Sequence, residues 1–176
     1  MKISLWRLLP FTVFLLLAVF FWRGLSLEPH HLPSVQIGKK LPDFKLPSLQ
    51  HQNEFFTPHA MTGQYKLLNF FASWCNTCSE EQIFLLRLAR EGIPVYGVNY
   101  KDNPIDAERW LLTWGNPYRE IGIDRTGKMA IDLGVYGTPE TFLIDKTGVI
   151  LARHVGALNQ EAWEKEFLPH INKHTV

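Results

Sequence analysis

The sequence has few cysteines, almost no net charge and no repetitive segments. Its 176 residues include 2 cysteines, and 18 lysines and arginines nearly balance 17 aspartates and glutamates, which leaves a formal net charge of +1. A charge this close to zero gives no electrostatic reason to expect a nucleic acid as a partner. No internal repeat, low-complexity tract or glycine-rich phosphate-binding loop is present. What is left is the composition of an ordinary globular protein, 46% hydrophobic and 20% charged.

One long hydrophobic run stands apart from the rest of the sequence, near its N-terminal end. It extends from Leu8 to Trp22 without a charge, and Lys2 and Arg7 precede it. Counted from Ile3, it approaches the roughly 20 apolar residues that span a bilayer, and no small-x-small cleavage pattern follows it. We therefore predict that residues 1–23 form a membrane-anchor helix, with its N-terminus in the cytoplasm because basic residues favour that side. A cleaved signal peptide is the alternative.

The rest of the sequence divides into a linker and one domain. Residues 24–40 are rich in proline, histidine and glycine, a composition that favours a linker. Residues 41–176 are numerous enough to bury a full hydrophobic core, so they are predicted to fold as one domain. Because the anchor keeps its N-terminus in the cytoplasm, this domain is expected on the exported side of the membrane.

Runs of apolar residues and helix-like patterns alternate along this domain. Continuous apolar runs are typical of strands buried on both faces, and apolar residues spaced three or four apart are typical of helices. The predicted elements are strands at 65–74 and 93–100, helices at 76–90, 105–114 and 159–173, and a β-hairpin at 141–155. This order calls for a central mixed sheet flanked by helices on both faces. The fold class is therefore α/β and thioredoxin-like, with an insertion around residues 101–123.

Both cysteines lie in the stretch "NFFASWCNTCSEEQ", at the point where a strand gives way to a helix. A thiol at the start of a helix faces free backbone N–H groups and the positive end of the helix dipole, which lower its pKa from about 8.5 toward 7 or below. Cys78 lies one helical turn after Cys75 and is expected to be more buried. We predict that Cys75 attacks a substrate disulfide and that Cys78 then releases the product.

Other uses of a Cys-x-x-Cys pair fit this sequence less well. A zinc site would need further ligands, but there is no second cysteine pair and the histidines are scattered. A c-type haem attachment site would need a histidine where Ser79 stands. A structural disulfide that closes so short a loop would constrain the unfolded chain little. We predict that the pair is itself the redox centre, with no metal or other cofactor.

Several segments resemble one known family. "FFASWCNTC" resembles the thioredoxin active site, and "GVYGTPETFLID" resembles the thioredoxin cis-proline loop. Together with "GVNYKD" and "WLLTWGNPY", they are similar to the membrane-anchored thioredoxin-like proteins of cytochrome c maturation, called DsbE or CcmG. The resemblance extends from about residue 41 to residue 171, and the predicted anchor fits it too.

The resemblance implies a function, a location and a set of partners. Members of this family are dithiol reductants on the periplasmic side of the bacterial inner membrane. They keep the Cys-x-x-Cys-His thiols of apocytochrome c reduced for haem attachment, directly or through other maturation proteins. A membrane electron donor of the DsbD or CcdA type reduces them again.

Three other functions were compared with this one on the sequence. A general exported disulfide reductase or oxidase would share every catalytic residue, so it stays an alternative. A copper chaperone of this fold would have its cysteines separated by three residues and a histidine in the later loop. A peroxidase would need the proline and threonine that Leu68 and Ala72 replace.

The resemblance also implies which residues form the site. Cys75 and Cys78 match the family's redox pair, and Pro139 matches a proline held in the cis form beside that pair. Trp74 and Thr138 adjoin these residues and are expected to bind substrate, because the backbone before a cis proline can pair with an extended chain.

Two carboxylates, Glu81 and Glu140, match acidic residues beside the family's active site. Asn69 stands where thioredoxin has a buried aspartate, and an asparagine cannot accept a proton. Our hypothesis is that Glu81 or Glu140 takes and returns the proton of Cys78 during exchange. Asn76 stands where the family has a proline between the cysteines, which leaves the reduction potential open.

Overall fold

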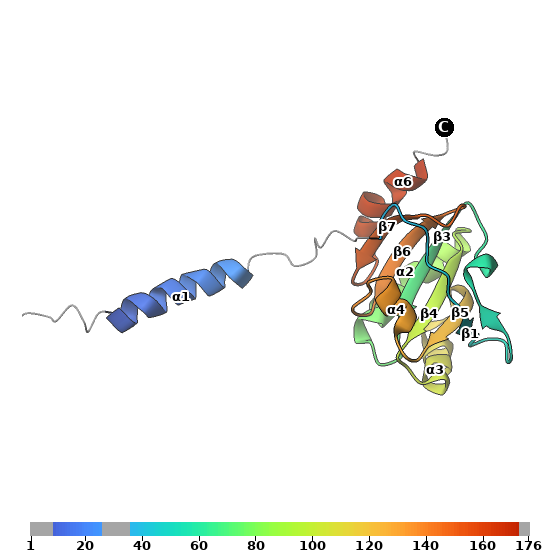
Figure 1. Ribbon diagram of the computed structural model, residues 1–176, viewed down its shortest axis with the longest axis horizontal. Helices are drawn as coiled ribbons and strands as arrows, with labels where there is room; N and C mark the ends of the chain where they lie inside the picture. The colour runs from blue at the N-terminus through green and yellow to red at the C-terminus, as the bar shows by residue number, and fades with distance from the viewer. Residues whose placement is uncertain (1–8, 26–35, 173–176) are drawn as a thin grey trace, which may run out of the picture. The chain divides into compact units, whose positions relative to one another are not determined.

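The computed structural model describes residues 9–25 and 36–172, and the chain divides into two units after residue 33 (Figure 1). In the first unit, helix α1 (Leu9–Leu25) has 17 residues and carries one basic side chain in its last turn, Arg23. Across the described ranges, we find no helix with the length and hydrophobicity needed to span a membrane. The predicted anchor, residues 1–23, also includes residues 1–8, which lie outside the described residues.

A mixed five-stranded sheet forms the centre of the second unit as described (Figure 1), in the order β5-β4-β3-β6-β7. Strands β3, β4 and β5 are parallel to one another, β6 is antiparallel to β3, and β7 is antiparallel to β6. The strands are β3 (Tyr65–Phe71), β4 (Val95–Tyr100), β5 (Tyr118–Asp124), β6 (Glu140–Asp145) and β7 (Ile150–Val155). The predicted mixed sheet is therefore confirmed.

Both faces of the sheet are covered, so every residue of β3 is buried. Leu67 and Phe71 face one hydrophobic core, and Leu68 and Phe70 face another, as the two-residue period of a strand requires. The first core holds side chains of two helices, α2 (Asn76–Arg90) and α3 (Pro104–Trp114). It also holds side chains of the C-terminal helical segments α5 (Gln160–Ala162) and η3 (Trp163–Phe167), after which α6 (Leu168–Asn172) follows. The second holds side chains of α4 (Lys128–Asp132) and of β1 (Leu46–Pro47) and β2 (Phe55–Phe56).

The segment before β1 runs along the sheet. The Gly38 N–H donates to the Ile150 carbonyl at 2.8 Å, and the Ile150 N–H donates to the Lys39 carbonyl at 2.9 Å. These contacts involve the end of the predicted linker, whose residues 26–35 lie outside the described part of the chain. Directly after β1, Ser48 forms an antiparallel bridge with Gly122 of β5. The short helix η2 (Pro58–Ala60) then leads to β3.

The structure corrects three element predictions. The strand expected at 65–74 ends at Phe71, and α4 was not predicted because its 5 residues are too few to show a helical period. Strand β5, which was not predicted, comes from the region around 101–123 and is an edge strand of the sheet. Edge strands tolerate charges, and Arg119 and Glu120 near the start of β5 concealed its pattern.

Candidate active site

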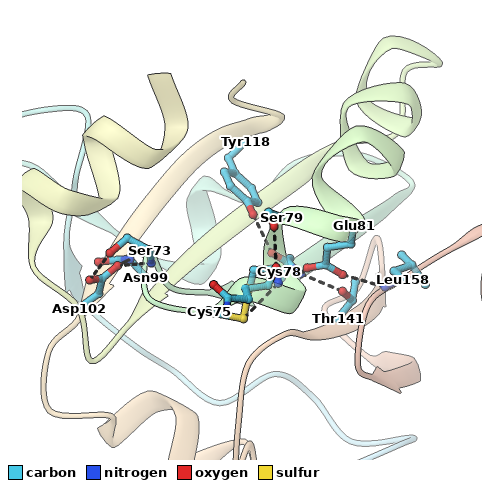
Figure 2. Close-up of a disulfide and its surroundings, with 12 residues drawn as sticks. Ser73, Cys75, Cys78, Ser79, Glu81, Asn99, Asp102, Tyr118, Thr141 and Leu158 are labelled. Carbon is cyan, nitrogen blue, oxygen red and sulfur yellow. Dashed lines mark hydrogen bonds between the residues drawn. A yellow bond between two sulfur atoms is a disulfide. The ribbon is translucent and has the colours of Figure 1, made fainter. Parts of the chain in front are cut away.

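Cys75 and Cys78 form a disulfide at the N-terminal end of α2 (Figure 2). Cys75 is the N-cap of this helix, and its Sγ atom accepts a hydrogen bond from the Cys78 N–H at 3.2 Å. Cys75 is 6% exposed and Cys78 is fully buried, so the order of accessibility is the predicted one. The helix terminus thus directs an N–H donor and the positive end of its dipole at the outer sulfur.

Glu81 lies one helical turn after Cys78 and is 1% exposed. Its Oε1 atom accepts a hydrogen bond from Asn69 Nδ2 at 2.7 Å, and its Oε2 atom accepts one from the Leu158 N–H at 2.9 Å. Burial raises the pKa of Glu81 to about 7, and these two hydrogen bonds act in the opposite direction. No basic side chain forms an ion pair with Glu81 in the described ranges.

Asn69 on β3 connects Glu81 to two other buried side chains. Its Nδ2 atom also donates to Thr141 Oγ1 at 3.0 Å, and its Oδ1 atom accepts from the Tyr118 hydroxyl at 2.7 Å. Burial raises the pKa of Tyr118 well above its ordinary value, so this hydroxyl stays protonated and donates. The Tyr118 bond fixes the Asn69 amide with its NH₂ group toward Glu81. Asn69 therefore holds the carboxylate in place and takes no proton itself.

Glu140, at the start of β6, forms a buried ion pair with Arg153 of β7. Arg153 Nη2 lies 2.6 Å from Glu140 Oε2, and the two side chains are 7% and 0% exposed. Arg153 also donates to the Gly134 carbonyl at 2.9 Å, and its guanidinium lies over the Tyr136 ring at 4.8 Å. Burial raises the pKa of Glu140, and Arg153 opposes this shift. The sequence analysis did not identify Arg153.

The loop before β6 carries the proline that the family resemblance singled out. The Thr138–Pro139 peptide bond is cis, as the resemblance implied. The Tyr136 N–H donates to Glu140 Oε1 at 3.2 Å, and the Gly156 N–H donates to the Pro139 carbonyl at 2.9 Å. Thr138 Oγ1 is buried and has no hydrogen-bond partner among the described residues. The loop is therefore held by its own strand and by β7.

The sheet register brings this loop to the cysteines. Phe70 of β3 pairs with Glu140 of β6, so the residues just before Glu140 lie beside the residues just after Phe71. Cys75 follows at the start of α2, and Thr138 is two residues before Glu140. The predicted site residues thus lie together where β3 ends and β6 begins, on the two inner strands of the sheet. They are Trp74, Cys75, Cys78, Glu81, Thr138, Pro139 and Glu140.

Trp74 is exposed next to the disulfide, with 56% of its surface accessible. Its Nε1 atom donates to the Lys101 carbonyl at 3.2 Å, which holds the indole against the segment after β4. Tyr136, on the loop before the cis proline, is also 59% exposed. Two aromatic side chains are thus available near the sulfurs for contact with another molecule.

The described residues hold no group of three or more His, Cys, Asp or Glu side chains suited to bind a metal ion. The chemistry that this arrangement offers is an exchange between the two sulfurs and an external disulfide, with buried carboxylates nearby. A family model described as Redoxin matches residues 36–168 of the chain.

Relatives named thiol:disulfide interchange protein DsbE match most of the chain. The one from Pseudomonas aeruginosa is 44% identical over 162 residues, which cover 92% of this chain and 90% of the relative. The one from Escherichia coli is 45% identical over 149 residues, which cover 84% and 80%. The chain belongs to the DsbE family. A crystal structure of a candidate DsbE from Chlorobium tepidum has a TM-score of 0.61 and 30% identity, and it covers 77% of this chain and 98% of its own.

Membership of the DsbE family makes the protein a thioredoxin-like thiol-disulfide oxidoreductase. Its Cys-x-x-Cys pair forms a disulfide at the N-terminus of α2 and is the group that undergoes thiol-disulfide exchange.

Proposed function

We propose that this DsbE-family protein is a dithiol reductant that keeps the Cys-x-x-Cys-His thiols of apocytochrome c, or of a maturation partner, reduced for haem attachment. The observation that carries the proposal is the intact redox pair at the start of α2 in a chain that matches DsbE relatives over most of its length. The proposed substrate comes from the family resemblance of the sequence segments described above.

Exchange begins from the reduced protein. The Cys75 thiolate attacks one sulfur of the substrate disulfide, so that a mixed disulfide forms and the other substrate sulfur leaves as a thiolate and is protonated. Cys78 then loses its proton and attacks the Cys75 sulfur, which releases the second substrate sulfur. Two electrons pass to the substrate, and the protein is left with the Cys75–Cys78 disulfide seen in the structure.

Glu81, rather than Glu140, is the carboxylate proposed to take the proton of Cys78. Protonation of Glu140 would leave the buried Arg153 guanidinium without its counter-ion, which is costly in a buried site. Glu81 has no such partner among the described residues, and burial sets its pKa at about 7, where a group exchanges protons most easily at neutral pH. It also lies on the same helix as Cys78, one turn away.

The substrate is proposed to bind as an extended chain along the loop before β6. The backbone beside Thr138 can pair with such a chain as an added strand, while the exposed rings of Trp74 and Tyr136 contact its side chains. Glu140, held by its buried ion pair with Arg153, accepts the Tyr136 N–H of this loop. The pair is therefore proposed to hold the loop in place before the substrate binds.

The protein is proposed to act in the periplasm, held at the bacterial inner membrane by residues 1–23 and reduced again by a DsbD- or CcdA-type donor. The hydrophobic run and the basic residues before it support this placement. Each turnover leaves the pair as the disulfide, and an oxidising compartment does not reduce it again, so a reductase function requires an electron supply from the other side of the membrane.

The alternative is a general exported disulfide reductase or oxidase that uses the same residues. Deleting the gene and staining for covalently bound haem distinguishes the two. We expect loss of c-type cytochromes, with recovery by the intact gene and no recovery by a Cys75→Ser variant. Normal haem attachment in the deletion strain would contradict the proposed substrate and leave the general reductase as the function.

A further inference from the structure

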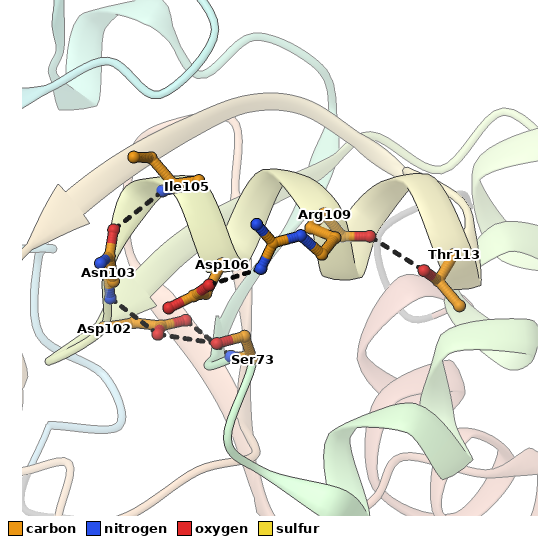
Figure 3. A network of polar contacts seen from close by, with 7 residues as sticks. All are labelled: Ser73, Asp102, Asn103, Ile105, Asp106, Arg109 and Thr113. Carbon is orange, nitrogen blue, oxygen red and sulfur yellow. Dashed lines mark hydrogen bonds and ion pairs between the residues drawn. The ribbon is translucent and has the colours of Figure 1, made fainter.

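Asp102 lies between the end of β4 and the start of α3, and its carboxylate accepts four hydrogen bonds, from Ser73 and Asn103 (Figure 3) and from Asn99 (Figure 2). Oδ2 accepts from the Ser73 N–H at 2.6 Å and from Asn99 Nδ2 at 2.8 Å. Oδ1 accepts from Ser73 Oγ at 2.8 Å and from the Asn103 N–H at 2.8 Å. Asp102 is 9% exposed, and within the described residues it has no basic partner.

Two of these four bonds come from Ser73, which lies in the turn that delivers Cys75 to α2. The Cys75 N–H donates to the Ala72 carbonyl at 3.2 Å, so Ser73 and Trp74 are the two central residues of this turn. Bonds to an ionised carboxylate are roughly twice as strong as those between neutral groups. Asp102 therefore holds both the backbone N–H and the side-chain hydroxyl of Ser73.

The residue before Asp102 holds the next residue of the same turn. Lys101 has a φ of 45°, in the left-handed region that a residue with a side chain rarely adopts. Its carbonyl accepts the Trp74 indole N–H at 3.2 Å. Two consecutive residues after β4 thus bind two consecutive residues before Cys75.

Asn99 shows that the local structure is arranged around the Asp102 carboxylate. Its Nδ2 atom donates to Asp102, while its buried Oδ1 atom has no partner among the described residues. A buried acceptor left without a donor is unfavourable, and its presence here indicates that the bond to Asp102 determines how the amide is oriented.

We propose that Asp102 is a positioning residue of the redox site, which holds the Ser73–Trp74 turn so that the Cys75 sulfur stays at the N-terminus of α2 in both redox states. Asp102 touches neither sulfur and acts through Ser73. The proposal rests on thiol-disulfide exchange at Cys75 and does not depend on which protein is reduced.

Asp102→Asn in the full-length chain, kept in mild detergent, tests this role. The substitution turns one oxygen into an NH₂ group, which cannot accept from a backbone N–H, so the bond from the Ser73 N–H or the bond from the Asn103 N–H is lost. The bonds to Ser73 that remain no longer involve a charged carboxylate. Amide hydrogen exchange at Ser73 should become faster, the alkylation profile of Cys75 should move to higher pH, and reduction of oxidised glutathione at pH 7 should slow roughly tenfold. A fold that was merely weakened would not move the alkylation profile of the native protein.

The chain offers a matched control and a second variant. Asp106 lies in the first turn of α3, the helix that follows Asp102, and its ion pair with Arg109 at 2.8 Å is exposed (Figure 3), so Asp106→Asn should leave all three measurements unchanged. Ser73→Ala keeps the 2.6 Å backbone bond and loses only the hydroxyl bond, so a smaller change in the same direction is expected.

The outcomes separate this inference from the proposed function. If Asp102→Asn lowers stability but leaves the Cys75 profile and the glutathione rate equal to those of Asp106→Asn, the positioning role is overturned while the reductase proposal stands. If the Ser73 exchange rate and the Cys75 profile move as expected but the unaltered chain fails to reduce glutathione, the positioning role stands and the reductase proposal is contradicted.

Discussion

Glu81 and Glu140 are both buried carboxylates beside the redox pair, but their neighbours give them different tasks. Glu140 is paired with the guanidinium of Arg153, and this pair supports the loop that carries the cis proline. Glu81 accepts only uncharged N–H donors, from Asn69 and from the backbone of Leu158. A carboxylate without a cation nearby can take up a proton without leaving a buried cation unpaired, and for this reason we propose Glu81 for the proton transfer.

The first prediction concerns Glu81→Gln. Without a group that can take the proton, attack by Cys78 on the mixed disulfide should slow by roughly tenfold or more near pH 7, and the pH dependence around 7 should disappear. Rapid-quench measurement of mixed-disulfide decay from pH 5.5 to 8.5 reports this step. Glu80→Gln, at an exposed position on the same helix, serves as the control. An unchanged profile in Glu81→Gln would remove Glu81 from the mechanism.

The second prediction concerns Arg153→Met. Removing the guanidinium leaves Glu140 buried without a partner, and breaking a buried pair in this way costs about 3 kcal/mol or more. We expect denaturant unfolding to show this loss, and the double variant with Glu140→Gln to recover part of it. A loss below about 1 kcal/mol would mean that the pair contributes little to the loop.

At the scale of elements, the site is formed where three segments meet at one edge of the sheet. Strand β3 leads into α2, the register of β6 brings the cis-proline loop alongside, and the segment after β4 holds the turn before Cys75. The edge strand β5 completes the sheet and supplies Tyr118, whose hydroxyl orients Asn69. The orientation of Glu81 therefore depends on a strand that carries none of the predicted site residues.

The third prediction tests the packing of β5 against the β1–β2 pair. A Cβ atom at Gly122 would lie 2.8 Å from Leu46 Cβ and 2.9 Å from Phe56 Cδ1, too close for either to remain in place. Gly122→Ala should therefore lower the free energy of unfolding by about 1–3 kcal/mol. Gly137→Ala, where a Cβ meets nothing within 4 Å, should change stability much less. Equal stabilities for the two variants in denaturant unfolding would contradict this packing.

Local patterns were sufficient for most elements of the fold. The helix predicted at 76–90 is the observed α2, because its apolar stripe lies within the segment, and its N-cap Cys75 and Gly92 lie only one and two residues beyond its ends. Strand β5 was missed because its partners, β4 and the segment around Ser48, lie elsewhere in the sequence and set its burial. Its charged residues made it resemble a loop.

The site was predictable to the extent that its residues are close in sequence. Cys75, Cys78 and Glu81 follow one another along one helix, whereas Asp102 is separated from Ser73 by 29 residues and Tyr118 from Asn69 by 49. Such contacts depend on the tertiary fold and leave no periodic pattern. Arg153 did leave a signal, since it lies in the hairpin predicted at 141–155, directly before which stands the opposite charge of Glu140, and the observed register makes the two diagonal neighbours.

At the scale of the whole molecule, the burial of Glu81 links folding to pH. Its pKa is about 7 in the folded chain against 4.5 for an ordinary glutamate, so between these values the folded state binds more protons than the unfolded state. Stability from this group is therefore fully present below pH 4.5 and is lost as pH rises through 7. A carboxylate that changes charge near neutral pH is the kind of group that the proposed proton transfer from Cys78 uses.

The fourth prediction follows from this linkage. Between pH 4.5 and pH 8, the free energy of unfolding of the unaltered chain should fall by about 3 kcal/mol more than that of Glu81→Gln. Denaturant unfolding of both oxidised proteins across this range measures the difference. Parallel curves for the two proteins would show that Glu81 does not titrate as its burial requires.

The proposed exchange requires above all that the Cys75 sulfur is ionised near neutral pH, and we expect this because Cys75 caps α2. The most direct measurement is the rate of alkylation of the reduced protein by iodoacetamide as a function of pH, with Cys78 replaced by serine so that one thiol reacts. We predict a midpoint clearly below the value of about 8.5 for a free cysteine. A midpoint at or above that value would contradict the account.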